Sequence, residues 1–327
     1  MIAYGHPTSG IQPECAPSLD PMLLGMSEPI AGLVKAGYVV AVSDYQGLGN
    51  DGTYHPYLDS TTAGYNLVDA VRAARKLVPN TSNRWGAFGG SQGGQAAWAA
   101  NELAAGYAAE LELVGTASYS APLSIAGLVD AAMDGSLTSE QRFVLLQVLA
   151  SLAKESPDFQ LDDYRRGAAK QNWDVLLACT GPDVAKRDEI ANEITADDVR
   201  PISDQAADML RSRLQQMSLP RTPATAPILI VYGGQDELVR PVWTNEALNE
   251  ACRMGDVIQI ELQVDRGHAQ VDGSLAFPWI LQRFAGDAPR NDCPALIEPV
   301  EEIAPAEPSE PVETAEPAEA IEPPQEP

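Results

Sequence analysis

One serine lies between glycines at the point where a predicted strand becomes a predicted helix. The stretch RWGAFGGSQGGQAAWAA, residues 84–100, begins with an apolar segment and ends in small, helix-forming residues. Within it, Gly89-x-Ser91-x-Gly93 has the form G-x-S-x-G, in which the two glycines allow a turn so tight that the hydroxyl is exposed. The backbone N–H of the next residue, Gln92, then points to where an oxyanion would form. Such a turn needs a strand before it and a helix after it, so it constrains the fold together with the chemistry.

A glycine-rich turn between a strand and a helix can also bind a nucleotide, because the backbone approaches a pyrophosphate closely at a helix N-terminus. The glycine spacing here gives neither G-x-G-x-x-G nor the Gly-Lys-Ser/Thr of a P-loop. The pattern therefore favours a nucleophile over a nucleotide site. Because G-x-S-x-G also occurs by chance, this interpretation needs an acid and a histidine later in the chain, in that order.

Strand-like and helix-like segments alternate on both sides of this turn. The segment 66–78 has apolar residues at helical spacing and arginines on its other side. Strands that alternate with helices predict a mostly parallel sheet with helices on both faces. Apolar, β-branched runs near glycine predict strands at 2–4, 38–43, 85–88, 113–117, 228–232 and 257–264.

The alternation stops in the middle of the chain. Residues 1–120 and 224–297 are expected to form the two parts of the strand-and-helix core. Between them, residues 121–223 contain helical patterns and no convincing strand, and Thr138 with Gln141 makes a capping box before the apolar helix RFVLLQVLASLAK. We interpret this insertion as a helical lid or cap.

Charge is distributed unevenly along the chain. The net charge of the 327 residues is −25, but residues 298–327 hold ten Glu and no Lys or Arg, which leaves −15 for the rest. An acidic chain argues against nucleic acid or an anionic membrane as a partner. The Glu-Pro-Ala repeat of 298–327 has no apolar face to bury, so we expect a disordered tail there. No run of about 20 apolar residues occurs, and no transmembrane segment is expected.

The four cysteines, Cys15, Cys179, Cys252 and Cys293, are widely spaced and form no C-x-x-C pair. Because the chain has only three histidines, we expect no zinc site, and no other cofactor is indicated. An even number of separated cysteines fits two disulfides in an oxidising compartment, with buried free thiols as the alternative. We pair Cys252 with Cys293, which bracket the last strand and the terminal helix. Cys15 and Cys179 would then tie the first loop to the insertion.

His268 is the preferred candidate for a catalytic base. It follows the last predicted strand directly, in QVDRGHAQV, where an α/β-hydrolase carries its base. His6, after the first strand, and His55, in a later loop, are the other two histidines of the chain. Their positions do not match the loop that the α/β-hydrolase fold uses.

Asp236 is the preferred candidate for the acid. It follows the strong strand ILIVY in YGGQDELVRP, whereas Glu237 is its nearest rival and Asp265 lies very close to the histidine in sequence. Ser91, Asp236 and His268 then stand in the chain order of α/β-hydrolases. In this arrangement the histidine takes the proton of the serine, and the aspartate holds the imidazole in the right tautomer.

Several motifs occur together in a fixed order: HPTSG, VSDYQGLGNDG, HPYL before VDAVRAAR, FGGSQGGQAAWAA, YGGQDELVRP and RGHAQV. In this order they resemble the secretory lipase family, to which fungal lipase A and actinobacterial secreted lipases and esterases belong. The resemblance covers about residues 1–297 and is weak across the insertion. It implies an α/β-hydrolase that is secreted and cleaves small esters or acylglycerols through an acyl-enzyme on Ser91. It also implies that Asp44, in the SDYQG motif, supplies the second oxyanion donor through its backbone N–H.

The resemblance further implies that the insertion forms a lid with an acyl-binding tunnel. The helix RFVLLQVLASLAK is apolar on more than one face, so we expect it to roof the serine, with Leu146 and Leu149 in contact with an acyl chain. Tyr164 and Trp173 are further candidates for the acyl site, although packing of the lid onto the core is the simpler interpretation for either one.

Two other functions are compatible with the same fold. A serine peptidase or amidase would usually carry a β-propeller or a charged substrate anchor, and neither is present in the sequence. A non-catalytic binding protein has typically lost a triad member, whereas all three candidates are present here. Family members usually have one or two strands before the segment that matches IAYGHPTSG, so an exposed sheet edge is expected. Acyl-chain preference, the natural substrate and the oligomeric state stay open.

Overall fold

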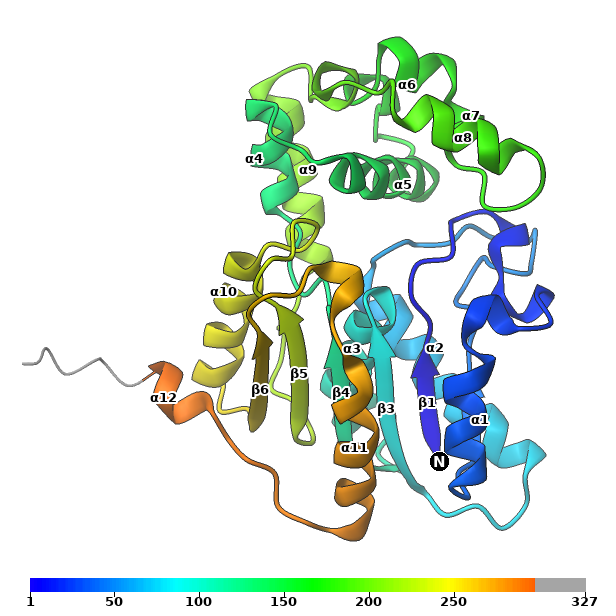
Figure 1. Ribbon diagram of the computed structural model, residues 1–327, viewed down its shortest axis with the longest axis vertical. Helices are drawn as coiled ribbons and strands as arrows, with labels where there is room; N and C mark the ends of the chain where they lie inside the picture. The colour runs from blue at the N-terminus through cyan, green and yellow to red at the C-terminus, as the bar shows by residue number, and fades with distance from the viewer. Residues whose placement is uncertain (298–327) are drawn as a thin grey trace, which may run out of the picture. The chain divides into compact units, whose positions relative to one another are not determined.

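The computed structural model describes residues 1–297, so the tail expected at 298–327 lies outside the described residues. Six strands form one sheet in the order β2-β1-β3-β4-β5-β6, and every neighbouring pair is parallel (Figure 1). All six predicted strands are present, with ends that differ by at most two residues. They are β1 (Ile2–Gly5), β2 (Val40–Val42), β3 (Arg84–Gly90), β4 (Glu112–Tyr119), β5 (Ile228–Gly233) and β6 (Ile258–Gln263).

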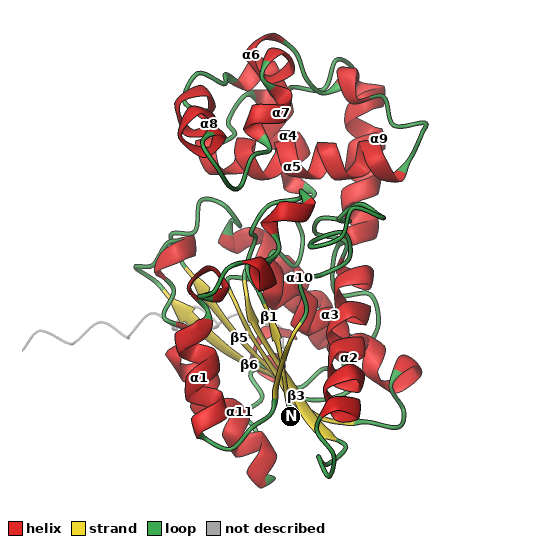
Figure 2. Cartoon of the chain, turned by 90° about the vertical axis from the view of Figure 1, so that its right-hand side faces the viewer, coloured by secondary structure: helices red, strands yellow, loops and turns green. Residues whose placement is uncertain are grey.

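Helices cover both faces of the sheet, as the alternation of segments predicts (Figure 2). Side chains of a strand point to alternate faces, and β5 follows this rule. Ile228 and Ile230 pack with helices on one face, whereas Leu229 and Val231 pack with helices on the other. One face carries α2 (Ser60–Leu77), α3 (Gln92–Tyr107) and α10 (Pro241–Arg253), and the other carries α1 (Ser27–Lys35) and α11 (Ala276–Ala285).

Residues 121–223 are helical and contain no strand, and they lie beyond the carboxyl ends of the strands (Figure 1). We call this segment the cap. It has an apolar core built mainly from side chains of its own helices, to which Ile11, Tyr57, Leu58 and Trp243 from outside the cap also contribute. Its helices are α4 (Gly127–Asp134), α5 (Ser139–Glu155), α6 (Gly167–Gln171), α7 (Trp173–Leu176), α8 (Asp183–Ala191) and α9 (Asp204–Met217).

Helix α5 begins at the capping box that its sequence indicates. The hydroxyl of Thr138 accepts a hydrogen bond from the backbone N–H of Gln141, and the Gln141 side chain accepts one from the N–H of Thr138, each over 3.1 Å. Two of the four free N–H groups of the helix end are satisfied in this way. The start of the central helix of the cap is therefore fixed by local sequence.

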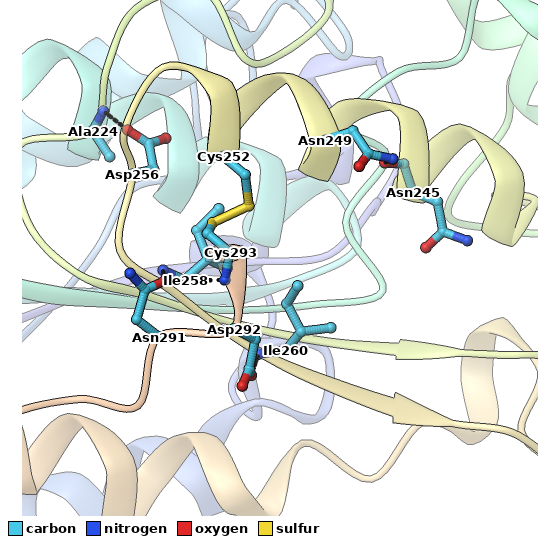
Figure 3. Close-up of a disulfide and its surroundings, with 10 residues drawn as sticks. All are labelled: Ala224, Asn245, Asn249, Cys252, Asp256, Ile258, Ile260, Asn291, Asp292 and Cys293. Carbon is cyan, nitrogen blue, oxygen red and sulfur yellow. Dashed lines mark hydrogen bonds between the residues drawn. A yellow bond between two sulfur atoms is a disulfide. The ribbon is translucent and has the colours of Figure 1, made fainter. Parts of the chain in front are cut away.

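Two disulfides join segments that are distant in the sequence. Cys15 is bonded to Cys179, which links the region after β1 to the cap, and Cys252 is bonded to Cys293, which links α10 to α12 (Cys293–Ile297). These are the same pairs that the sequence suggests. Figure 3 shows the second disulfide beside β6, where the Asp292 carboxylate accepts a hydrogen bond from the N–H of Ile260 over 2.8 Å. The chain that returns after α11 is thereby held to the edge of the sheet.

The two outer strands of the sheet are β2 and β6. β2 has three residues, all partly exposed, and pairs with β1 alone. Within residues 1–297, no helix combines the length and the apolar character needed to cross a membrane.

Candidate active site

Ser91 alone occupies the turn between β3 and α3. Its φ and ψ of 51° and −123° lie in a region that residues other than glycine rarely adopt, so the surrounding structure must hold this conformation. A Cβ on Gly93 would overlap the carbonyl oxygen of Gly5, and a Cβ on Gly89 would overlap the backbone of Gly93. The glycines of the G-x-S-x-G motif are therefore required by the close approach of two backbones.

The side chains of Ser91, His268 and Asp236 form one hydrogen-bonded series. Ser91 Oγ is 3.0 Å from His268 Nε2, and His268 Nδ1 is 2.8 Å from Asp236 Oδ2. Asp236 is 4% exposed, and its Oδ1 accepts hydrogen bonds from the N–H groups of Leu238 and Val239 over 2.9 and 2.8 Å. Because a carboxylate oxygen accepts, His268 Nδ1 carries the proton, and Nε2 is left to accept the hydroxyl proton of the serine.

The alternative acids and bases lie elsewhere. Glu237 and Asp265 are exposed, and neither has a hydrogen bond to a histidine within residues 1–297. His6 and His55 are buried, and their rings bind backbone carbonyls and the side chain of Gln92. Of the three histidines in the chain, His268 has a carboxylate partner.

The two backbone N–H groups expected to form the oxyanion site have no hydrogen-bond partner within residues 1–297. One belongs to Gln92, the first residue of α3, and it is among the N–H groups that a helix leaves free at its start. The other belongs to Asp44, in the loop after β2. The carboxylate of Asp44 accepts a hydrogen bond from the N–H of Ser18 over 2.8 Å, and its carbonyl oxygen lies 3.2 Å from His6 Nε2. Asp44 is thus fixed through its side chain and carbonyl while its N–H stays available.

A pocket of about 700 Å³ opens above Ser91 and His268. Core and cap both line it, and most of its wall is apolar. Within residues 1–297, no cluster of His, Cys, Asp and Glu could hold a metal ion. The apolar lining includes Pro7, Leu58 and Val239 from the core and Ile125, Leu128, Phe143, Val144 and Ala191 from the cap.

Helix α5 does roof the serine, but the expectation for its residues was wrong. Leu146 and Leu149 are 2% and 0% exposed in the apolar core of the cap and do not line the pocket. Phe143 and Val144, one turn earlier, line it instead. A helix packed on nearly all sides is apolar all round, so its sequence does not show which face meets the pocket.

Tyr164 and Trp173 are packing residues, as the simpler interpretation expects, but their partners lie within the cap and not in the core. Tyr164 stacks on Phe159 with ring centroids 4.7 Å apart, and the Arg165 guanidinium lies over the Trp173 ring. Neither side chain is among those that line the pocket.

A pair of hydroxyls in the pocket was missed by the sequence analysis. Tyr57 Oη and Thr8 Oγ1 are 2.8 Å apart, and both residues line the pocket. They belong to HPYL and HPTSG, motifs that contributed only to the family resemblance. The signal was the repeated His-Pro step, because each one precedes a residue of this pair.

Comparison with known families identifies the chain. The family model for secretory lipases matches residues 18–292, which is most of the chain. The chain belongs to the secretory lipase family. It is therefore a carboxylic ester hydrolase, and both its family and its two disulfides are consistent with an extracellular location. No curated protein sequence gives a significant match.

Solved structures with the same fold include Candida antarctica lipase A in its closed state, with a TM-score of 0.70, 18% identity, and coverage of 88% of this chain and 71% of that one. A putative hydrolase from Legionella pneumophila has a TM-score of 0.68 and 20% identity over 86% of this chain and 77% of its own. The rice cell wall degrading esterase LipA from Xanthomonas oryzae gives 0.61 and 22% over 87% and 78%. At such identities the likeness establishes the α/β-hydrolase fold.

Proposed function

We propose that this secretory lipase hydrolyses esters through an acyl-enzyme on Ser91, with His268 as general base and Asp236 as the residue that orients it. The proposal rests on one observation, the unbroken hydrogen-bonded series of 3.0 and 2.8 Å from Ser91 through His268 to a buried carboxylate. A serine hydroxyl is a weak nucleophile at its ordinary pKa, so a base within reach of its proton is the essential requirement.

The reaction then follows from the roles of these groups. His268 Nε2 takes the hydroxyl proton as Ser91 Oγ attacks the ester carbonyl, and the imidazolium is stabilised by Asp236. The negative charge that develops on the carbonyl oxygen is received by the backbone N–H groups of Gln92 and Asp44. Each such donor typically contributes about 3–4 kcal/mol to the transition state. His268 next protonates the leaving alcohol, and water repeats the sequence to release the acid.

The pocket supports a substrate with an apolar acyl group. Most of its wall consists of apolar side chains of the cap and the core, with a few polar and charged ones such as Glu140 and Arg187. Burying one methylene group in such a site is favourable by about 0.8 kcal/mol. We therefore assign small esters or acylglycerols as the substrate class. We further propose that the protein is secreted and that the cap acts as a lid.

Labelling with a fluorophosphonate tests the proposal, because the probe reacts with an activated serine. The wild type should be labelled at Ser91 and should hydrolyse p-nitrophenyl butyrate. Ser91→Ala and His268→Ala should each lower kcat by a factor of about 10⁴ or more, and the double variant should be little worse than either one. Ser82→Ala is the matched control, since Ser82 is exposed just before the start of β3, at the strand end opposite Ser91. Folded wild type without label or hydrolysis would contradict the proposal and favour a binding protein.

A further inference from the structure

His55 is a buried histidine that the proposed mechanism does not use. It is 3% exposed, and both ring nitrogens have partners. Nδ1 lies 2.9 Å from the carbonyl oxygen of Gln46, and Nε2 lies 3.0 Å from the side-chain Nε2 of Gln92. The ring thus connects the loop after β2 with the first residue of α3.

The two partners determine the tautomer of the ring. A carbonyl oxygen only accepts hydrogen bonds, so Nδ1 must carry the proton that binds Gln46. Burial lowers the pKa of His55 to about 4, so the ring is neutral near pH 7 and its Nε2 accepts. The amide nitrogen of Gln92 supplies that proton, which fixes the orientation of the amide group. A protonated ring would place two donors against each other.

Each of the two residues that bind the His55 ring, Gln46 and Gln92, is at or close to a proposed oxyanion donor. Gln92 offers its own backbone N–H, while its side chain binds the ring. Gln46 is two residues after Asp44, which offers the second N–H. The loop that carries Asp44 also lies directly against the backbone of Tyr54 and His55. A Cβ on Gly47 of this loop would overlap that backbone.

The backbone of His55 is fixed by the cap. Ser151, on α5 and 2% exposed, donates its hydroxyl to the carbonyl oxygen of His55 over 2.9 Å. The same hydroxyl accepts a hydrogen bond from the N–H of Tyr57, also over 2.9 Å. The position of the ring is therefore set from a third element, the helix that roofs the pocket.

We infer that His55 is a positioning residue for the oxyanion site, acting through the side chain of Gln92 to hold the two donors, the N–H groups of Gln92 and Asp44, at a fixed separation. This inference rests on the proposed function. Donors of this kind act by being in place before the charge develops, and small displacements of reacting groups can cost about 10²-fold in rate. Loss of the connection should therefore weaken binding of the transition state more than binding of the ester.

The sharpest test is Gln92→Met, which keeps the backbone N–H and the length of the side chain but cannot donate to His55. We expect kcat for p-nitrophenyl butyrate to fall by about 10-fold or more, because the donors are displaced, while KM changes less than about two-fold, as for an interaction made mainly in the transition state. The Ki of a trifluoromethyl ketone, which forms a tetrahedral alkoxide on the serine, should rise by the same factor as kcat/KM falls. Gln95→Met is the matched control, since Gln95 is a buried glutamine on the same helix whose amide faces the carbonyl of Met217 over 3.5 Å.

A second set of variants separates positioning from structural support. His55→Ala should repeat the kcat loss, and the double variant His55→Ala with Gln92→Met should be no worse than the more severe single variant, because both remove the same connection. His55→Gln, whose amide offers one donor and one acceptor, should recover part of kcat. Should His55→Ala fail to fold, Gln92→Met alone decides the matter.

The results distinguish this inference from the proposed function. A wild type that neither hydrolyses the ester nor reacts with the fluorophosphonate removes both. An active wild type whose kcat is unchanged in folded Gln92→Met overturns the positioning role alone. Equal losses in Gln92→Met and Gln95→Met, or a rise in KM without a fall in kcat, would also overturn it.

Discussion

Asp44 is held at two points, its carboxylate and its carbonyl, while its N–H has no protein partner within residues 1–297. Its carboxylate binds the N–H of Ser18, its carbonyl lies beside the ring of His6, and the next residue, Tyr45, has a φ of 67°. A non-glycine residue with a positive φ costs free energy, so the rest of the loop must stabilise this conformation. This is the arrangement expected of a backbone donor whose side chain serves only to fix it.

Substitutions at Asp44 therefore separate the backbone from the side chain. Asp44→Asn keeps both the N–H and an oxygen that can accept from Ser18, so its effect on kcat should be small. Asp44→Pro deletes the N–H, and loss of one oxyanion donor typically lowers kcat by about 10²–10³. Ester hydrolysis by the two variants, with folding checked by circular dichroism, decides whether the backbone N–H or the side chain of Asp44 matters. A folded Asp44→Pro enzyme with full kcat would remove Asp44 from the oxyanion site.

At the scale of elements, α5 makes two kinds of contact along its length. Its first turns present Phe143 and Val144 to the pocket, while later residues fill the core of the cap. The Arg187 guanidinium, from α8, lies 5.4 Å from the centre of the Phe143 ring. Two helices of the cap therefore meet at the side chain that an acyl chain would touch.

An acidic residue at this point should change chain-length preference. For the wild type we expect KM to fall by about tenfold or more from p-nitrophenyl acetate to octanoate, because each buried methylene contributes up to about 0.8 kcal/mol. Because ground and transition states share the acyl contacts, kcat should change less. Val144→Asp should abolish the trend and spare acetate hydrolysis. Met209→Asp, at an exposed position of α9 that does not line the pocket, is the control. A wild type equally efficient on both esters would contradict the acyl contact.

The strands, and the places of Ser91, Asp236 and His268 after strand ends, could be predicted because their sequence signals are local. Each strand is a short apolar run, and all except β3 contain β-branched residues, while the chain order of the acid and the base needs no contact information. The face of α5 that meets the pocket could not be predicted, because surrounding helices rather than its own sequence decide it. The bond between His55 and Gln92 was also inaccessible, since it depends on how two loops fold against each other.

In the whole molecule, core and cap are joined where the chain crosses between them. Leu123 lies where the chain enters the cap after β4, and Leu219 lies where it leaves the cap before β5. The N–H of Leu219 donates to the carbonyl of Leu123 over 2.7 Å. The Cys15–Cys179 disulfide adds a covalent connection at another point. His55 lies between these two parts through its bond to Ser151. Its protonation should therefore affect the stability of the whole fold.

The stability of the protein should fall as the pH is lowered towards the pKa of His55. Burial lowers that pKa from the ordinary 6.5 to about 4. Between these two pH values the unfolded chain binds a proton that the folded chain does not, so the free energy of unfolding decreases as the pH falls. A shift of this size corresponds to about 3 kcal/mol over the full window. Well above pH 6.5 neither the folded nor the unfolded chain binds this proton, so the protonation of His55 no longer changes the free energy of unfolding.

His55→Gln isolates the contribution of His55 protonation to the free energy of unfolding. The other buried ionisable groups, His6 and Glu102 among them, are common to the wild type and the variant. Urea unfolding at intervals from pH 7 to pH 4 gives the difference in unfolding free energy between wild type and variant. That difference should shift in favour of the variant by up to about 3 kcal/mol as the pH falls, whatever its value at pH 7. If the unfolding free energies of wild type and variant change in parallel across this pH range, His55 protonates equally well in the folded and the unfolded chain. The neutral ring, on which its bond from Gln92 depends, would then not be maintained by burial.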